Sequence, residues 1–137
     1  RAIRRKLAVK VSLDDAWAAW TTNEGARRFL SDQTDIEPVL GGKYEVLFLP
    51  RNPEGLRGCE GCRVQTIVPK KLLRMTWNPP PHVELRGTGL RTLVTLRFTE
   101  VRPGEVVLHF SQTGFGDGPE WDRVFAYFSR GTWDTLF

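Results

Sequence analysis

Strands give way to a helix in the stretch Gly114-Phe-Gly-Asp-Gly-Pro119-Glu-Trp-Asp-Arg-Val-Phe125. Its glycines interrupt the preceding strand pattern, and Pro119 after Gly118 is typical of the first turn of a helix, with the glycine as its cap. One helical stripe then repeats at spacings of three or four residues, namely Trp121, Phe125, Phe128, Thr132 and Leu136. We therefore expect one long helix from Pro119 to Phe137 whose aromatic stripe packs against a sheet.

The chain before this helix begins with a strand and two short helices. Period-two alternation predicts the strand at residues 6–11. Ser12 is placed to cap the first helix, with Asp15 at its third position. Asn23 is the expected cap of the second helix.

Residues 35–112 alternate between strand patterns and turn residues. Gly41-Gly42 is typical of a hairpin, and the prolines of Asn78-Pro-Pro-Pro-His82 exclude regular structure there. The expected strands are residues 35–40, 43–49, 62–68, 72–77, 92–101 and 106–112. Because the connecting turns are mostly short, we expect antiparallel pairing.

This order of elements predicts an α+β fold. A twisted antiparallel sheet of about seven strands curves around the long C-terminal helix, and the two short helices after the first strand cover one end. The 137 residues contain no repeat or linker and are read as a single domain, 1–137. A chain of this length buries roughly two thirds of its surface without a disulfide or metal.

The amino-acid composition argues against two classes of binding partner, nucleic acid and the membrane interior. The net charge of +4 is mild and lacks a dedicated basic stripe, so no nucleic acid is expected. No apolar stretch approaches the ~20 residues of a membrane span. The chain contains two cysteines, which do not make a disulfide framework, so a cytoplasmic location is expected.

Cys59-Glu-Gly-Cys62 is the motif most suggestive of chemistry. A zinc site needs two more ligands, and the two histidines, His82 and His109, are poorly spaced for that purpose. A redox pair favours a helix N-terminus, whereas this motif lies beside a predicted hairpin. Ordinary buried or turn cysteines are the favoured interpretation. By strand alternation His109 points outward, and His82 is expected to be a loop residue.

The other catalytic patterns are absent or incomplete. There is no Gly-x-Ser-x-Gly elbow, and Gly114–Gly118 lacks the Lys-Ser/Thr ending of a phosphate loop. No carboxylates are paired on a predicted apolar face. We therefore predict no catalytic residue, no cofactor and no metal.

What remains is a set of mostly apolar side chains on predicted inward faces. Each one alone is expected to be core, but together with a few polar groups they resemble the lining of an apolar pocket. The predicted ligand-binding residues are Tyr44, Phe48, Val64, Thr66, Met75, Trp77, Phe98, Phe110, Gln112, Trp121, Phe125 and Phe128.

Blocks along nearly the whole chain resemble one known group of proteins. The blocks are Val9–Trp17, Gly41–Phe48, Gly61–Pro69, Leu72–Trp77, Thr113–Phe115, Trp121 and Phe128–Trp133. In this order they resemble the helix-grip proteins of the START and Bet v 1-like superfamily. Within it, the resemblance is to proteins similar to the C-terminal domain of the activator of Hsp90 ATPase. It implies a helix-grip fold with a cavity for lipids, polyketides or other apolar molecules, in a group that includes cyclases and chaperone assistants.

Three functions follow as hypotheses. The first is a non-enzymatic domain that holds a small apolar ligand between the C-terminal helix and the sheet. The alternative is a partner-binding module for an Hsp90-type chaperone, and the second alternative is a polyketide cyclase-like or hydrolase-like enzyme. The residues leave the oligomeric state and the ligand open.

Overall fold

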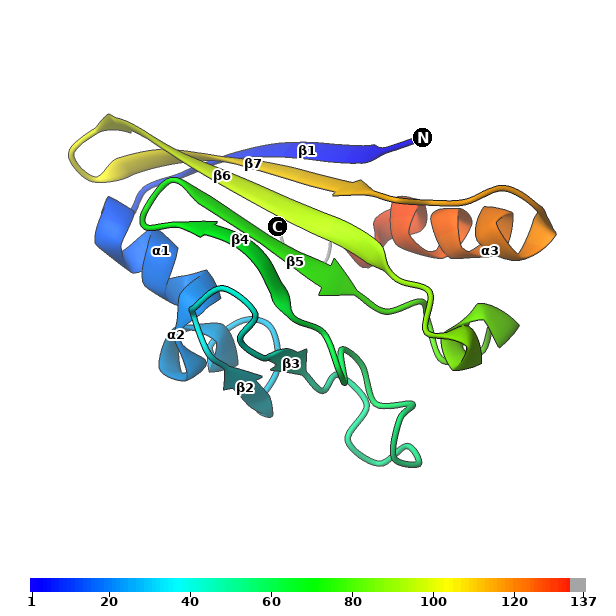
Figure 1. Ribbon diagram of the computed structural model, residues 1–137. Coiled ribbons are helices and arrows are strands. Elements are labelled where there is room, and N and C mark those ends of the chain that lie inside the picture. Colours follow the sequence, from blue (N-terminus) through cyan, green and yellow to red (C-terminus); the bar gives the residue numbers. More distant parts are fainter. Residues whose placement is uncertain (134–137) are drawn as a thin grey trace.

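The computed structural model describes residues 1–133 and has an α+β architecture (Figure 1). Its elements, in chain order, are β1 (Ile3–Val9), α1 (Leu13–Thr21), α2 (Asn23–Arg27), β2 (Thr34–Ile36), β3 (Tyr44–Val46), β4 (Val64–Val68), β5 (Leu72–Trp77), the 3-10 helix η1 (Glu84–Thr88), β6 (Thr92–Arg102), β7 (Glu105–Thr113), α3 (Pro119–Tyr127) and the π-helical turn η2 (Phe128–Thr132). The predicted fold class is confirmed, and β5 has the predicted bounds. No helix in the described residues is long and apolar enough to cross a membrane.

The strands form two sheets. Five of them lie in the order β1-β7-β6-β5-β4, with every neighbouring pair antiparallel. Strands β2 and β3 make a separate antiparallel pair, which single bridges Lys43–Arg63 and Leu47–Gly58 join to the chain around β4.

The hairpin before β4 is shorter than predicted. Pro38 has no N–H to donate to a neighbouring strand, and Gly41 takes a left-handed conformation, with φ of 77°. Residues 37–43 therefore form an extended turn, and the predicted strands 35–40 and 43–49 shrink to three residues each.

The two short helices cover one end of the sheet (Figure 1). The Ser12 side chain accepts a hydrogen bond from the backbone N–H of Asp15, as predicted for the cap of α1. The expected cap of α2 was wrong, because Thr22 caps that helix. The side chain of Asn23 instead accepts a hydrogen bond from the backbone N–H of Ile36, at the end of β2.

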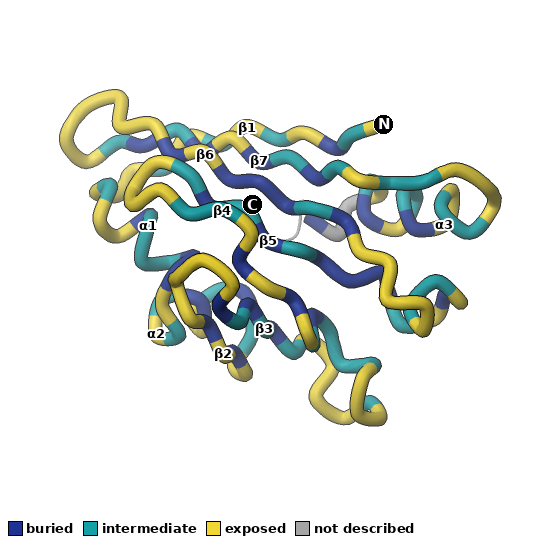
Figure 2. Tube along the Cα trace, viewed as in Figure 1, coloured by how far each residue is buried: buried dark blue, intermediate teal, exposed yellow. Residues whose placement is uncertain are grey.

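Side chains alternate between two faces of the five-stranded sheet. The inner face is lined by buried residues (Figure 2), including Val64, Leu73, Met75, Trp77, Val94, Leu96, Phe98, Leu108, Phe110 and Gln112. The opposite, outer face carries exposed side chains such as Arg97 and Thr99 and the buried Thr95, and the exposed His109 lies there as predicted.

The C-terminal segment lies at the other end of the sheet from α1 and α2 (Figure 1). The predicted Gly118 cap and Pro119 start are confirmed, but the segment is not one continuous α-helix, because it widens into the π-helical turn at Phe128. A π turn bonds residues five apart, which brings Phe128 and Trp133 onto one side, with ring centroids 6.0 Å apart and planes at 20°. Leu136, predicted on the stripe, lies outside the described residues, as does the side chain of Thr132.

Candidate ligand-binding site

An apolar cavity of about 210 Å3 lies where β5 ends, between the proline loop and the turns around Phe128. Its walls consist mainly of aromatic rings and prolines, with a few polar groups at the edge. The lining residues are Phe48, Leu49, Arg57, Gly58, Cys59, Trp77, Asn78, Pro79, Pro80, Pro81, Arg86, Tyr127, Phe128 and Trp133.

Trp133 is the centre of the aromatic wall. Its ring centroid lies 4.6 Å from that of Phe110 and 5.1 Å from that of Trp77. Trp77 in turn lies 6.1 Å from Phe48. The indole thus joins the inner face of the sheet to the C-terminal segment.

A chain of buried hydrogen bonds fixes this indole. Gln112, which is completely buried, accepts a 2.8 Å hydrogen bond from Nε1 of Trp133 and donates a 2.9 Å bond to the hydroxyl of Thr92. Thr92 donates to the backbone carbonyl of Trp77 at 3.2 Å. Since both polar atoms of the Gln112 amide have partners, this side chain orients Trp133 and presents no free group to a ligand.

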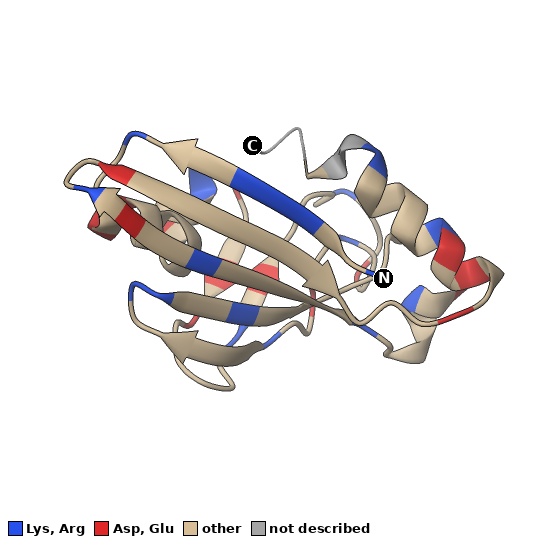
Figure 3. Cartoon of the chain, turned by 90° about the horizontal axis from the view of Figure 1, so that it is seen from above, with Lys and Arg blue, Asp and Glu red and all other residues tan. Residues whose placement is uncertain are grey.

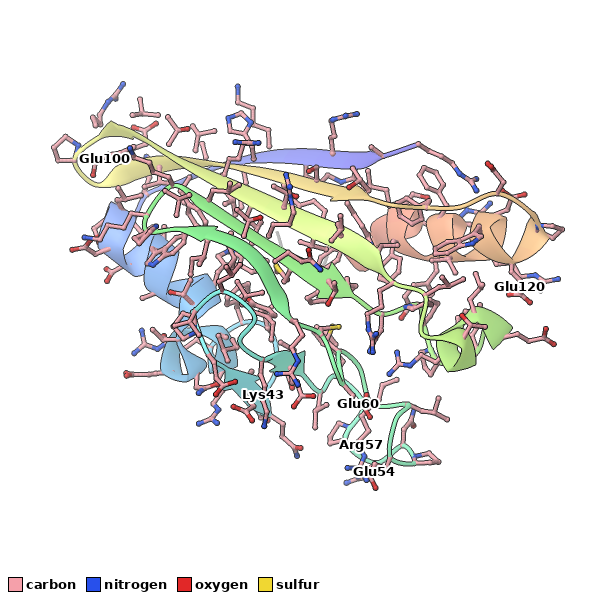
Figure 4. The ribbon with its side chains drawn as sticks, viewed as in Figure 1. Lys43, Glu54, Arg57, Glu60, Glu100 and Glu120 are labelled. Atoms are coloured by element: carbon pink, nitrogen blue, oxygen red, sulfur yellow. The ribbon has the colours of Figure 1, made fainter. Side chains whose placement is uncertain are left out.

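The polar edge of the cavity is also paired within the protein. The Arg86 side chain is only 7% exposed and forms an ion pair of 2.9 Å with Glu60. It also donates to the backbone carbonyls of Gly55 and Pro79, at 2.8 and 2.7 Å. Figure 4 shows Glu60 on the long loop that precedes β4, close to Arg57.

Asn78 holds this same loop against the end of β5. Its amide nitrogen donates to the carbonyls of Gly58 and Glu60 at 2.9 and 2.8 Å, and its oxygen accepts from Nε of Arg91 at 2.7 Å. Asn78 and Arg86 therefore organise the loop at this edge. The Arg57 guanidinium, which donates from Nε to the Asn52 carbonyl at 2.9 Å, also lines the cavity, whose remaining surface is mainly apolar.

The two cysteines lie beside the cavity as buried free thiols. Burial raises the pKa of Cys59 well above its ordinary value, and the hydrogen bond with Cys62 raises it further. That hydrogen bond lowers the pKa of Cys62; burial opposes this shift, and the charge of Arg91 assists it. Within residues 1–133 no three His, Cys, Asp or Glu side chains are grouped to hold a metal ion.

The predicted ligand-binding residues fall into several places. Phe48, Trp77 and Phe128 line the cavity, and Phe110 and Gln112 contact its wall through Trp133. The remaining predicted residues lie in the core, at the other end of the sheet, or on another surface.

Three of those residues are core side chains. Val64 and Met75 are buried opposite each other on β4 and β5. Tyr44 is completely buried, and its hydroxyl donates to the carbonyl of Trp20 at 2.6 Å.

The aromatic residues farther from the cavity contact other rings. Phe98 meets Trp17 of α1, with centroids 5.1 Å apart, at the opposite end of the sheet. Trp121 and Phe125 pack around Phe115 at 6.5 and 5.1 Å.

The inward assignment of Thr66 was wrong. A β-bulge lies between Val64 and Thr66, which shifts the register by one residue. Thr66 pairs with Arg74 rather than continuing the inward alternation, so its side chain joins the outer face.

Several lining residues did not stand out in the sequence. Arg86 and Asn78 reach the cavity edge through loop geometry that has no sequence period. The proline run after Trp77 was a usable signal, because an apolar loop that cannot pair must pack on something. Tyr127 and Trp133 lie off the predicted stripe, and the π turn brings Trp133 into the wall.

An antiparallel sheet with two short helices at one end and a C-terminal helix at the other is the architecture of a helix-grip protein. The family model described as "Activator of Hsp90 ATPase homolog 1-like protein" matches residues 10–136. The chain belongs to this family. No protein among curated sequences matches it.

Solved structures share the fold at low sequence identity. A Mesorhizobium loti protein has a TM-score of 0.71 and 23% identity, covering 100% of this chain and 91% of that protein. The Aha1 dimer from Colwellia psychrerythraea has a TM-score of 0.70 and 14% identity, covering 99% and 90%. An HSP90 activator from Plasmodium falciparum has a TM-score of 0.67 and 12% identity, covering 94% and 88%.

Proposed function

We propose that this chain is a non-enzymatic binding domain that holds a small, uncharged aromatic molecule in the cavity beside Trp133. The supporting observation is an aromatic wall whose neighbouring polar side chains, Arg86, Asn78 and Gln112, are already paired within the protein. A charged ligand gains no free counter-charge from these three groups, and Arg57, the other charged lining residue, is half-exposed and donates to the Asn52 carbonyl. An apolar ring, in contrast, buries its surface against the wall.

The size of the cavity limits the ligand. Sites for drug-sized molecules measure about 300–1,000 Å3, and an engineered apolar cavity of about 150 Å3 binds benzene. A volume of about 210 Å3 therefore suits a molecule of one or two rings.

Calorimetric titration with 1-naphthol tests this proposal. We expect saturable binding, and no comparable binding of 1-naphthoate, which has the same ring system and a carboxylate. Absence of saturable 1-naphthol binding, or equally tight 1-naphthoate binding, would contradict the proposal.

Two alanine variants separate the cavity from general effects on stability. Phe48→Ala removes an aromatic ring from the cavity wall. We expect 1-naphthol binding to weaken about tenfold, because the ligand loses part of its apolar contact with the protein. Phe29→Ala removes a ring that packs on Trp20 and does not line this cavity, and should leave the affinity unchanged.

Hydrolase chemistry has less support at this site. Glu60, the carboxylate beside the cavity edge, accepts hydrogen bonds from the backbone N–H groups of Arg57 and Gly58 in addition to its ion pair with Arg86. These contacts give it a structural role and leave it poorly placed to exchange a proton with a ligand.

A second candidate function, as a chaperone-binding module, is favoured by family membership and by the likeness to the Colwellia and Plasmodium proteins. Titrating the chain into an Hsp90-type chaperone, with ATP hydrolysis and complex formation both measured, tests it. We expect a complex and a raised hydrolysis rate. No complex would remove this candidate without affecting the ligand proposal.

A further inference from the structure

The outer face of the five-stranded sheet carries two rows of polar side chains. Directly paired residues lie on the same face, and the pairing places Arg4 opposite Ser111 and Lys6 opposite His109. On the other side of β7, His109 pairs with Arg97. The first row begins with Arg4 and Ser111, on β1 and β7. The second row consists of Lys6, His109 and Arg97, on β1, β7 and β6.

The first row continues the positive charge to β5. Ser111 pairs with Thr95, and Thr95 pairs with Arg74. Nε of Arg74 donates to the hydroxyl of Thr95 at 3.0 Å. Cations and hydroxyl groups thus extend from β1 to β5, about 14 Å at the usual strand spacing.

Within residues 1–133, no acidic side chain is paired with these cations. Among the described residues, Arg4, Lys6 and Arg97 form no ion pair, and all three are exposed. In Figure 3 the basic positions cross the middle of the sheet, and the acidic ones on these strands lie toward the β6–β7 hairpin. There Glu105 is already paired with Arg102.

Lys6 and Arg97 flank His109 on the two neighbouring strands, so two positive charges lie about 10 Å apart on one face of the sheet. A hollow of about 610 Å3 is lined by Lys6, Arg97 and His109 together with Thr95 and Ser111, and Phe110 is also among its lining residues. Because no ion pair within residues 1–133 involves Arg4, Lys6 or Arg97, their charges are available to a partner outside the chain.

We propose that this face binds an acidic segment of a protein partner, with Arg4, Lys6 and Arg97 as the principal contacts. The cations spread over a wider area than one phosphate group covers, which favours an extended polyanion. Proteins that bind single-stranded nucleic acid add aromatic rings on which bases stack, whereas the paired outward positions in these two rows carry no Phe, Tyr or Trp. The surface lies on the opposite side of the sheet from the cavity and does not depend on its ligand.

Fluorescence anisotropy with a fluorescein-labelled peptide of alternating glutamate and serine tests the proposal. We expect binding that weakens as NaCl rises from low salt to about 0.2 M, where exposed charges are strongly screened. A peptide of alternating glutamine and serine should not bind. Equal binding of the glutamine peptide, or tighter binding of oligo-dT than of the acidic peptide, would overturn the proposal.

Matched charge variants locate the surface. Lys6→Gln with Arg97→Gln should weaken acidic-peptide binding about tenfold, as expected for two exposed ion pairs. Arg28→Gln with Arg51→Gln removes the same charge from exposed positions elsewhere and should change binding less than twofold.

Folding of the variants is checked separately. Lys6→Arg with Arg97→Lys preserves the charge and should keep the affinity, whereas the glutamine pair should not unfold at a lower temperature than the parent chain. Unchanged binding in the glutamine pair would overturn the assignment.

Discussion

Trp133 and Gln112 are joined by a 2.8 Å hydrogen bond in a part of the core where neither side chain is more than 1% exposed. The bond links the C-terminal segment to β7 and sets the angle of the indole in the cavity wall. A hydrogen bond in so buried a place is costly to lose, because water cannot replace the missing partner.

Gln112→Leu keeps much of the side-chain volume and leaves the Trp133 N–H without its acceptor. We expect a loss of about 1–3 kcal/mol in the free energy of unfolding, measured by urea denaturation. Gln65→Leu, at an exposed position on β4, should change stability by no more than about 0.5 kcal/mol. Equal effects of the two substitutions would show that the buried bond does not stabilise the fold.

Tyr44→Phe should alter both stability and its dependence on alkaline pH. Losing the 2.6 Å bond to the Trp20 carbonyl is expected to cost about 1 kcal/mol at neutral pH. Burial raises the pKa of Tyr44 well above its ordinary value of about 10, and nearby Cys59 adds to this.

The sign of the pH effect follows from proton binding. Above pH 10 the unfolded chain loses the tyrosine proton while the folded chain keeps it, so the free energy of unfolding falls as the pH rises. Tyr44→Phe should flatten this fall relative to the parent chain in urea titrations above about pH 10. An identical alkaline slope in Tyr44→Phe and the parent would contradict the assignment.

Cys59→Ala should raise the pKa of Cys62. The hydrogen bond with Cys59 is the main cause of the lowered Cys62 pKa, so its removal leaves burial as the dominant influence. Thiolate absorbance near 240 nm, followed against pH, should show the first ionisation moving to higher pH. In Cys62→Ala the remaining Cys59 should ionise only well above its ordinary pKa, and an early ionisation there would reverse the assignment.

Arg86→Gln should loosen the loop that precedes β4. The substitution removes the mostly buried ion pair with Glu60 and the bond to the Gly55 carbonyl, with an expected cost of about 2 kcal/mol and faster proteolysis at this loop. Arg28→Gln breaks an exposed pair with Glu24 and should cost no more than about 0.5 kcal/mol. Equal protease resistance of Arg86→Gln and the parent would contradict this role.

Patterning predicted the long strands well, because their alternation of apolar and polar residues reflects burial on one side. Residues 72–77 form β5 as predicted, and the predicted strand 92–101 differs from β6 by one residue at its end. The same reasoning failed at Thr66, because a β-bulge changes the face of every residue beyond it without changing the pattern that precedes it.

The candidate site was less predictable than the fold. Its aromatic residues could be named from strand alternation, but Arg86 and Asn78 act through contacts between loops that are distant in sequence. The position of Trp133 in the cavity wall could not be predicted without knowing that a π turn precedes it, and a π turn has no distinctive amino-acid composition. The local periodicity of a strand determines which face of the sheet a residue lies on. The cavity depends instead on how the end of β5, the loops and the C-terminal segment pack together.

The π turn also ties the shape of the cavity to the stability of the fold. It places the Trp133 indole in the cavity wall and, at the same time, in the core against Phe110. A smaller residue at position 133 would enlarge the cavity, but it would also remove buried apolar surface and leave Gln112 without its hydrogen-bond partner. Evolution of a different cavity through this position would therefore need compensating changes elsewhere in the core.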